Sequence, residues 1–258
     1  MWTTRPQRPL PSLLSACLAV TLSAAGCSGQ TGPGVDFPPG TTRVLFVGNS
    51  LTYTNDLPRM VSALAGLAGG APVGTASATY PDFGLEDHWQ QGTARNLLAR
   101  HRWDYVVMQQ GPSALPESQL NLRHWSMQFN GPIRAAGAQP VLYMVWPASQ
   151  RRADFPGVRT SYHNAAAAVS GLLAPGGDAW LAAWDEAPSQ ALYGPDGFHP
   201  SVTGTYLAAL VILERIAGID PRSLPATIPG NGLDQATVRA LQRAARVALD
   251  RNPARPNP

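Results

Sequence analysis

The stretch RVLFVGNSLTYTND, residues 43–56, decides how the rest of the chain is interpreted. Its apolar, β-branched start at 43–47 predicts a short buried strand. The strand ends in a Gly-Asn-Ser turn at 48–50, where glycine permits a tight bend. Asp56 then precedes apolar residues at helical spacing, so the pattern predicts a strand, a turn and a helix. Ser50 is either a turn and capping residue or a nucleophile.

Strand-like and helix-like segments alternate along the rest of the chain. Short apolar runs predict further strands at 72–79, 104–109, 139–146 and 178–184. Apolar residues at helical spacing predict helices at 56–67, 85–101, 116–136, 159–173, 201–217 and 233–249. This alternation predicts a parallel sheet with helices on both faces. Ligands bind such sheets at the carboxyl ends of the strands, so the residues there are the first candidates for a site.

The composition is that of one folded domain. The chain has 258 residues, and 44% of them are apolar, which is enough to bury a core. Charged residues make up 14%, which argues against a disordered acidic or basic chain. The basic residues are scattered, and no run is longer than Arg151-Arg152. The sequence therefore offers no basic face for nucleic acid, and we expect no nucleic-acid partner.

The N-terminal segment predicts export. Arg5 and Arg8 precede a short apolar, small-residue run that ends before Cys27. This pattern is typical of a signal peptide, here residues 1–27, rather than of a membrane-spanning helix. The cysteine resembles that of a bacterial lipobox, which becomes the lipidated first residue of the mature chain. The resemblance implies a lipid anchor at the cell envelope, with simple secretion as the alternative.

Composition also divides the rest of the chain. Residues 28–42 are rich in Gly, Pro, Ser and Thr and predict a flexible tether. Residues 43–250 form the predicted domain, and the Pro-rich end at 251–258 predicts a disordered tail. The sequence makes no prediction of oligomeric state.

A serine hydroxyl needs a base, and an acid that orients the base, to act as a nucleophile. Four of the five histidines lie in predicted helices, whereas His199 lies in DGFHPS, between a loop and a helix start. Asp196 precedes it by three residues, so one ring nitrogen can contact the carboxylate while the other stays free for Ser50. The alternatives are a turn followed by a cap at this motif, and Asp185 as a rival acid. No spacing typical of a metal site occurs, so we expect no metal or cofactor.

GNSLTY after the first strand and DGFHPS before a late helix resemble motifs of the SGNH, or GDSL-type, hydrolases. The nucleophile motif of that family is usually Gly-Asp-Ser-Leu, and here it reads Gly-Asn-Ser-Leu at 48–51. The resemblance spans residues 43 to about 217. It implies a three-layer α/β/α sandwich with a flavodoxin-like sheet. It also implies a serine esterase or acyl hydrolase with Ser50, His199 and Asp196 as its triad.

The resemblance further implies an oxyanion hole. In the family, its donors are the serine backbone N–H, a glycine after the second strand and an asparagine after the third. Gly84 in YPDFGLEDHW stands at the glycine position. In place of the asparagine, the chain has QQGPS after the third strand. We expect Gln109 or Gln110 to be the third donor beside Ser50, with Ser113 as the alternative.

The implied substrate is an ester, and family habit together with an envelope location favours acyl groups on carbohydrate. Three tryptophans near the expected cleft pack in the core or stack on a sugar: Trp89, Trp146 and Trp184. The loop at 150–158 is a candidate lid. A lipase or thioesterase is one alternative. Another is a catalytically silent module that keeps the fold and binds envelope glycans.

Overall fold

The computed structural model describes residues 35–230 and 232–254. Within them, five parallel strands form one sheet in the order β2-β1-β3-β4-β5. The strands are β1 (Thr42–Gly48), β2 (Val73–Thr79), β3 (Tyr105–Met108), β4 (Gln139–Tyr143) and β5 (Leu172–Ala174). This is the flavodoxin-like strand order.

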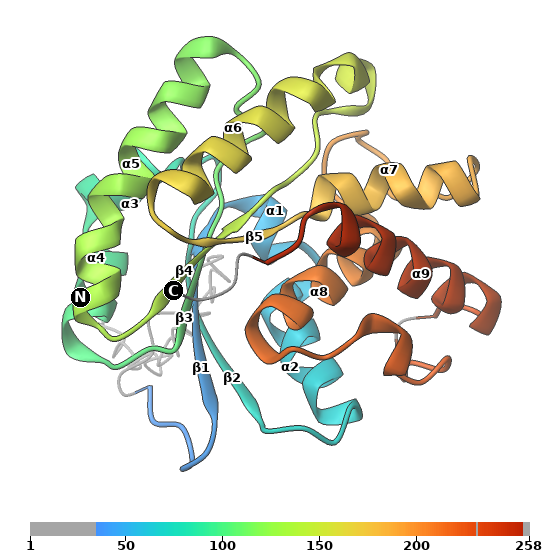
Figure 1. Ribbon diagram of the computed structural model, residues 1–258, viewed down its shortest axis with the longest axis horizontal. Coiled ribbons are helices and arrows are strands. Elements are labelled where there is room, and N and C mark those ends of the chain that lie inside the picture. Colours follow the sequence, from blue (N-terminus) through green and yellow to red (C-terminus); the bar gives the residue numbers. More distant parts are fainter. Residues whose placement is uncertain (1–34, 231, 255–258) are drawn as a thin grey trace, which may run out of the picture.

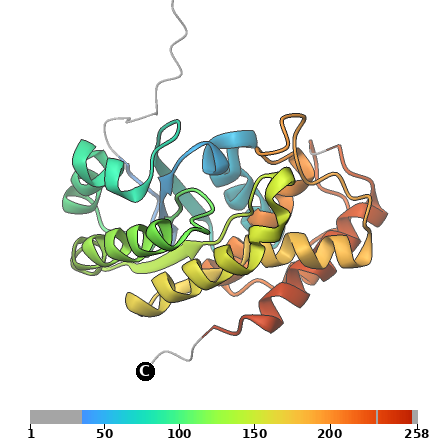
Figure 2. The same cartoon turned by 90° about the horizontal axis from the view of Figure 1, so that it is seen from above.

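Helices cover both faces of the sheet, as Figure 1 shows. One layer holds α3 (Leu85–Gln91), α4 (Thr93–Arg100), α5 (Pro116–Ala135) and α6 (Phe155–Ala168). The other holds α2 (Leu57–Leu67), α7 (Gly176–Glu186), α8 (Val202–Ala217) and α9 (Gln235–Arg251). Helices α5 and α6 run side by side in both views (Figures 1 and 2). The predicted three-layer α/β/α sandwich is confirmed.

Short elements connect the layers. They are α1 (Ser50–Tyr53) and three 3₁₀ turns, η1 (Thr54–Asp56), η2 (Ser149–Asp154) and η3 (Pro221–Ser223).

Strand β1 pairs with both β2 and β3, and residues 44–47 are fully buried. A central parallel strand is covered on both faces, which explains why this stretch is continuously apolar.

The strand predicted at 178–184 is wrong. This stretch, DAWLAAW, forms most of helix α7, and the edge strand is β5, which was predicted as the end of a helix. The buried ring of Trp180 stacks on Trp146, with ring centroids 3.5 Å apart. A seven-residue apolar run fits a buried strand and a buried helix equally well, so periodicity alone does not separate them.

Two predicted helices differ in detail. The helix predicted at 85–101 is broken at Gly92, whose φ of 89° ends α3 in the left-handed conformation. The helix predicted at 116–136 is α5, which contains Pro132 in its last turn. The fourth strand is shorter than the predicted 139–146 and ends at Tyr143.

The predicted signal segment with Cys27, residues 28–34 of the tether and residues 255–258 of the tail lie outside the described residues, so those assignments stay predictions. Phe37 packs edge-on against Trp103, with ring centroids 6.2 Å apart, and β1 begins at Thr42. At the other end, α9 reaches Arg251 and Asn252 is buried.

In the described part of the chain, no helix has the length and apolarity needed to cross a bilayer.

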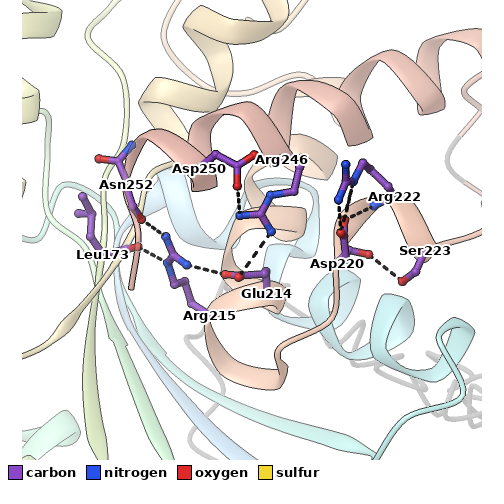
Figure 3. Close-up of polar contacts among 9 residues, drawn as sticks. All are labelled: Leu173, Glu214, Arg215, Asp220, Arg222, Ser223, Arg246, Asp250 and Asn252. Carbon is purple, nitrogen blue, oxygen red and sulfur yellow. Dashed lines mark hydrogen bonds and ion pairs between the residues drawn. The ribbon is translucent and has the colours of Figure 1, made fainter. Parts of the chain in front are cut away.

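Arg215 ties the C-terminal helix to the edge of the sheet (Figure 3). Its side chain lies on α8 and is 3% exposed. It donates to the carbonyl oxygen of Leu173 on β5 at 2.7 Å and to that of Asn252 after α9. It also pairs with Glu214, which faces Arg246 of α9. The buried charge therefore has partners on β5, α8 and the end of α9.

We expect Arg215→Met to destabilise the fold by about 3 kcal/mol, because it leaves two carbonyl groups without a donor and Glu214 without its closest partner. Thermal unfolding followed by circular dichroism measures the change. Arg222→Ala is the matched control, since Arg222 is 59% exposed and pairs with Asp220 two residues away, and its midpoint should stay that of the wild type. Equal midpoints for the two variants would contradict this account of Arg215.

Candidate active site

The candidate site lies where β1 and β3 end, side by side in the sheet. The connection after β1 leads to α2 and the one after β3 leads to α5, in opposite layers, so a crevice opens between the two strand ends. Ser50 follows β1 as the first residue of α1, and Gln109 and Gln110 follow β3. The structure therefore brings these three predicted residues to one edge of the sheet.

Ser50 sits in a capped turn. The side chain of Asn49 accepts a hydrogen bond from the N–H of Leu51 at 3.1 Å, which starts α1 at Ser50. Ser50 is 8% exposed. Neither its hydroxyl nor its backbone N–H makes a hydrogen bond within the described residues. Both groups are free for a ligand in the cleft that Ser50 lines.

The side chain of Gln109 holds this turn. It is fully buried, and its Oε1 accepts from the N–H of Asn49 at 3.0 Å and from the hydroxyl of Thr52 at 2.7 Å. Its Nε2 donates to Oδ1 of Asn49 at 2.9 Å and to the carbonyl oxygen of Gln110 at 2.6 Å. Gln109 thus forms hydrogen bonds with the chain on both sides of Ser50. It has no amide hydrogen left for an oxyanion, and it does not line the cleft.

Gly48 and His88 complete the support of the turn. A Cβ at Gly48 would lie 2.5 Å from Oε1 of Gln109, so this position has room only for glycine. His88 of α3 is fully buried, and its Nε2 donates to the carbonyl oxygen of Gly48 at 2.9 Å. Burial lowers the pKa of His88, so the ring is neutral. His88 is therefore a packing residue behind the turn.

Gln110 lines the cleft beside Ser50. Its Oε1 accepts from the N–H of Leu85 at 3.2 Å, and its Nε2 donates to Oγ of Ser113 at 2.9 Å. The second Nε2 hydrogen makes only a long contact, 3.4 Å, with Oδ1 of Asn121 on α5. Of the two glutamines, Gln110 is the one whose amide can turn to a ligand.

Gly84 lines the same cleft at the start of α3, but its N–H is engaged. It donates to the carboxylate of Asp87 at 2.8 Å, which is a helix-capping contact. Gly84 can donate to a substrate only after Asp87 moves away. Ser113 bonds back to the carbonyl oxygen of Gly111 at 3.1 Å and supports Gln110 rather than replacing it.

His199 and Asp196 form a pair in the loop before α8. Nδ1 of His199 lies 2.5 Å from Oδ2 of Asp196, and the other carboxylate oxygen accepts from the N–H groups of Phe198 and His199, each at 3.0 Å. The bond from the imidazole, followed by these N–H bonds, lowers the pKa of Asp196 from 3.8 to about 2. The carboxylate therefore holds the proton on Nδ1. Nε2 of His199 has no partner within the described residues and is free to accept a proton.

The loop with His199 is tied to its surroundings from two sides. Asn55, five residues after Ser50, donates through Nδ2 to the carbonyl oxygen of Pro200 at 3.0 Å and to Oγ1 of Thr205 at 2.9 Å. Nε1 of Trp146, at the end of β4, donates to the carbonyl oxygen of Phe198 at 3.0 Å. The chain after the nucleophile and the end of the fourth strand thus position this loop together.

The predicted residues divide between two adjoining hollows. Ser50, Gly84 and Gln110 line a cleft of about 780 Å³, which Phe198 also borders. Asp196 and His199 line a second hollow of about 670 Å³. Among the described residues, no hydrogen bond joins Ser50 to His199. The structure therefore brings the three residues to one region without forming the contact between nucleophile and base.

The remaining candidates lie elsewhere. Asp185 is on the surface of α7, 3.9 Å from Arg251, and lines neither hollow. None of the three tryptophans proposed to stack on a sugar lines the cleft, and Trp146 is fully buried. Trp184 lies under the guanidinium of Arg152 in turn η2, whose Cζ is 3.6 Å from the ring centroid. In the described part of the chain, no group of three or more His, Cys, Asp or Glu side chains is placed to hold a metal ion.

Sequence reasoning missed Asn55, Asn121 and the positioning role of Gln109. Nothing in the sequence marks the two asparagines, because one lies in a turn and the other lies well inside a helix. Gln109 was expected as a donor because it follows a buried strand, as Gln110 does. The role of Gln109 follows from contacts with a residue 60 positions away, whereas the side chain of Gln110 contacts Leu85, 25 positions away.

Similar solved structures are hydrolases or proteins of that fold. A protein classified as an SGNH hydrolase from Slackia heliotrinireducens is 30% identical, with a TM-score of 0.59, over 69% of this chain and 100% of that one. A DUF4886 family protein from Bacteroides uniformis is 20% identical, with a TM-score of 0.69, over 81% and 95% of the two chains. An acetylxylan esterase from Geobacillus stearothermophilus is 14% identical, with a TM-score of 0.53, over 68% and 94%. No protein-family model and no curated protein matches the chain.

We expect the carboxyl group of Asp196 to titrate near pH 2, and its pKa to rise toward 3.8 in His199→Ala, which removes the largest cause of the shift. Because the folded-state pKa is the lower one, the pair stabilises the fold above about pH 3.8, and this contribution is lost as the pH falls toward 2. Carbon-13 NMR of the side-chain carboxyl group measures the pKa. A value near 3.8 in both proteins would show that the ring and the carboxylate are not paired in solution.

Proposed function

Because the chain belongs to the SGNH hydrolase superfamily, we propose that it is a serine hydrolase that cleaves esters through Ser50, His199 and Asp196. The observation that carries the proposal is the state of Ser50. Ser50 is 8% exposed, its hydroxyl has no hydrogen-bond partner among the described residues, and it lines the cleft that adjoins a paired imidazole and carboxylate. A serine hydroxyl that no protein group binds is available to a ligand in the cleft, which favours a reactive role.

In the proposed reaction, Oγ of Ser50 attacks the ester carbonyl carbon and its proton passes to Nε2 of His199. Asp196 accepts the Nδ1–H bond throughout and stabilises the imidazolium. The ester C–O bond then breaks, and Nε2 returns its proton to the leaving alcohol. Water releases the acyl group from Ser50 in a second round with His199 as the base. Ser50 and His199 must approach each other for this, and such contacts often tighten only when substrate binds.

The oxyanion hole is proposed to use the backbone N–H of Ser50 and the amide of Gln110. The first is free in the structure, and the second has a hydrogen in only a long contact. The N–H of Gly84 joins them when the substrate displaces Asp87. Gln109 is proposed to position the nucleophile turn instead of donating to the substrate.

The substrate is proposed to be an ester of a polar compound such as an acylated carbohydrate. More than half of the residues that line the cleft are polar, which suits a hydroxyl-rich group better than a long acyl chain. The similar fold of an acetylxylan esterase agrees with this choice. We also propose, from the sequence alone, that the chain is exported and anchored through Cys27, which would place it near envelope glycans.

The purified chain should hydrolyse p-nitrophenyl acetate, and Ser50→Ala should lower kcat by about 10⁴-fold or more, because it removes the nucleophile. Initial rates on the acetate, butyrate and octanoate esters measure the effect and the preferred acyl length. Gln110→Ala should lower kcat by about 10²- to 10³-fold if its amide serves the oxyanion.

Ser118→Ala is the matched control, because Ser118 lines the same cleft and has no role in the proposed reaction. Its rates should equal those of the wild type. Equal rates for the wild type and Ser50→Ala on all three esters would overturn the proposal. That result would favour a silent module that binds glycans through the same cleft.

A further inference from the structure

The cleft that holds Ser50 has an acidic wall. Five carboxylates line it against a single guanidinium, that of Arg151. They come from the loop before α3, the start of α3, the start of α5 and the turn before α6: Asp82, Glu86, Asp87, Glu117 and Asp154. The whole chain carries a formal net charge of +3, so this acidity is local to the cleft.

Arg151 compensates only one of these carboxylates. Its guanidinium lies 2.6 Å from Asp154, three residues away in turn η2. Asp82 and Glu117 make no ion pair within the described residues. The acidic wall therefore keeps most of its charge.

The other two carboxylates have neutral partners. Glu86 accepts from Nδ2 of Asn121 at 2.9 Å and from Nε1 of Trp125 at 3.1 Å. Asp87 accepts from the backbone N–H of Gly84. These partners are neutral, so they do not cancel the negative charge of either carboxylate.

The acidic wall lines the same cleft as Ser50, the proposed nucleophile. Ser50 is 8% exposed, its hydroxyl has no partner among the described residues, and Gln110 lines this cleft too. Asn121 joins the two features, because it donates to Glu86 and lies 3.4 Å from the amide of Gln110. Charges on the walls of a concave site act strongly on a ligand inside it, since the surrounding protein focuses their field.

We infer that the cleft selects its ester by charge. It favours a substrate whose alcohol or acyl part carries a positive charge, such as a protonated amine, accepts a neutral one, and rejects one that carries a carboxylate, sulfate or phosphate. The inference rests on the proposed esterase function and narrows its substrate class. Repulsion of the wrong charge is a common source of such selectivity.

Three thioacetates of similar size test the inference: acetylthiocholine, its neutral carbon analogue 3,3-dimethylbutyl thioacetate, and the thioacetate of 2-mercaptoethanesulfonate. At low ionic strength we expect kcat/KM to fall by about tenfold at each step from cation to neutral ester to anion. At 0.5 M salt these ratios should shrink, because salt screens the charges of an open cleft. One thiol reagent detects all three products.

The double variant Asp82→Asn, Glu117→Gln separates charge from structure, because no hydrogen bond or ion pair of either carboxylate is found in the described part of the chain. It should lose most of the difference in kcat/KM between the cation and the anion. Equal rates on all three esters in the wild type, or a preference that neither salt nor the variant changes, would overturn the inference alone. Absence of Ser50-dependent hydrolysis of every ester would overturn the proposed function and the inference with it.

Discussion

The four hydrogen bonds of the Gln109 side chain are the contact on which the candidate site depends. A parallel sheet brings the ends of β1 and β3 together, but it does not fix the conformation of the turn that follows β1. Gln109 does so, because one amide group bonds to the backbone and side chain of Asn49 and to Thr52, on either side of Ser50. A buried amide with every group paired is costly to disturb, so the turn that carries Ser50, the proposed nucleophile, has a rigid support.

The other half of the site is fixed by ties between segments far apart in the sequence. His199 lies in the loop before α8, and Asn55 and Trp146 hold that loop from the first and fourth strands. The fold thus places His199, the proposed base, near Ser50, the proposed nucleophile, without forming the hydrogen bond between them. We expect Ser50 and His199 to come into contact when a substrate fills the cleft between Gln110 and Phe198.

The fold was predictable from the sequence, and the triad could be proposed from it, because both leave local signals. Alternating apolar runs and helical spacing indicate a parallel sheet, and the Gly-Asn-Ser and Asp-x-x-His motifs each sit in a loop with its own turn and cap residues. The motifs resemble those of the SGNH hydrolases, and the relative that is 30% identical shows that the chain belongs to this family. The prediction of a strand at 178–184 was wrong because the apolar residues there fit a strand and a helix equally well.

The sequence could not predict the separate roles of Gln109 and Gln110, because each role depends on the direction in which the side chain points after strand β3 ends. Gln109 and Gln110 are neighbours, and successive residues of an extended chain face opposite sides. One therefore turns to the nucleophile loop and the other to the cleft, and no local pattern says which. The acidic wall likewise arises from segments that meet only in the fold.

The most direct test of the central claim is the rate at which a fluorophosphonate labels Ser50, identified by peptide mass mapping, in the wild type and in Gln109→Met. Gln90→Met, at an exposed position, is the control, and circular dichroism confirms that each protein is folded at the temperature used. We predict labelling of Ser50 in the wild type and control, and a rate about 100-fold lower in Gln109→Met, because a small misplacement of a nucleophile has an effect of this size. Labelling at equal rates in all three proteins, or no label on Ser50, would contradict the account.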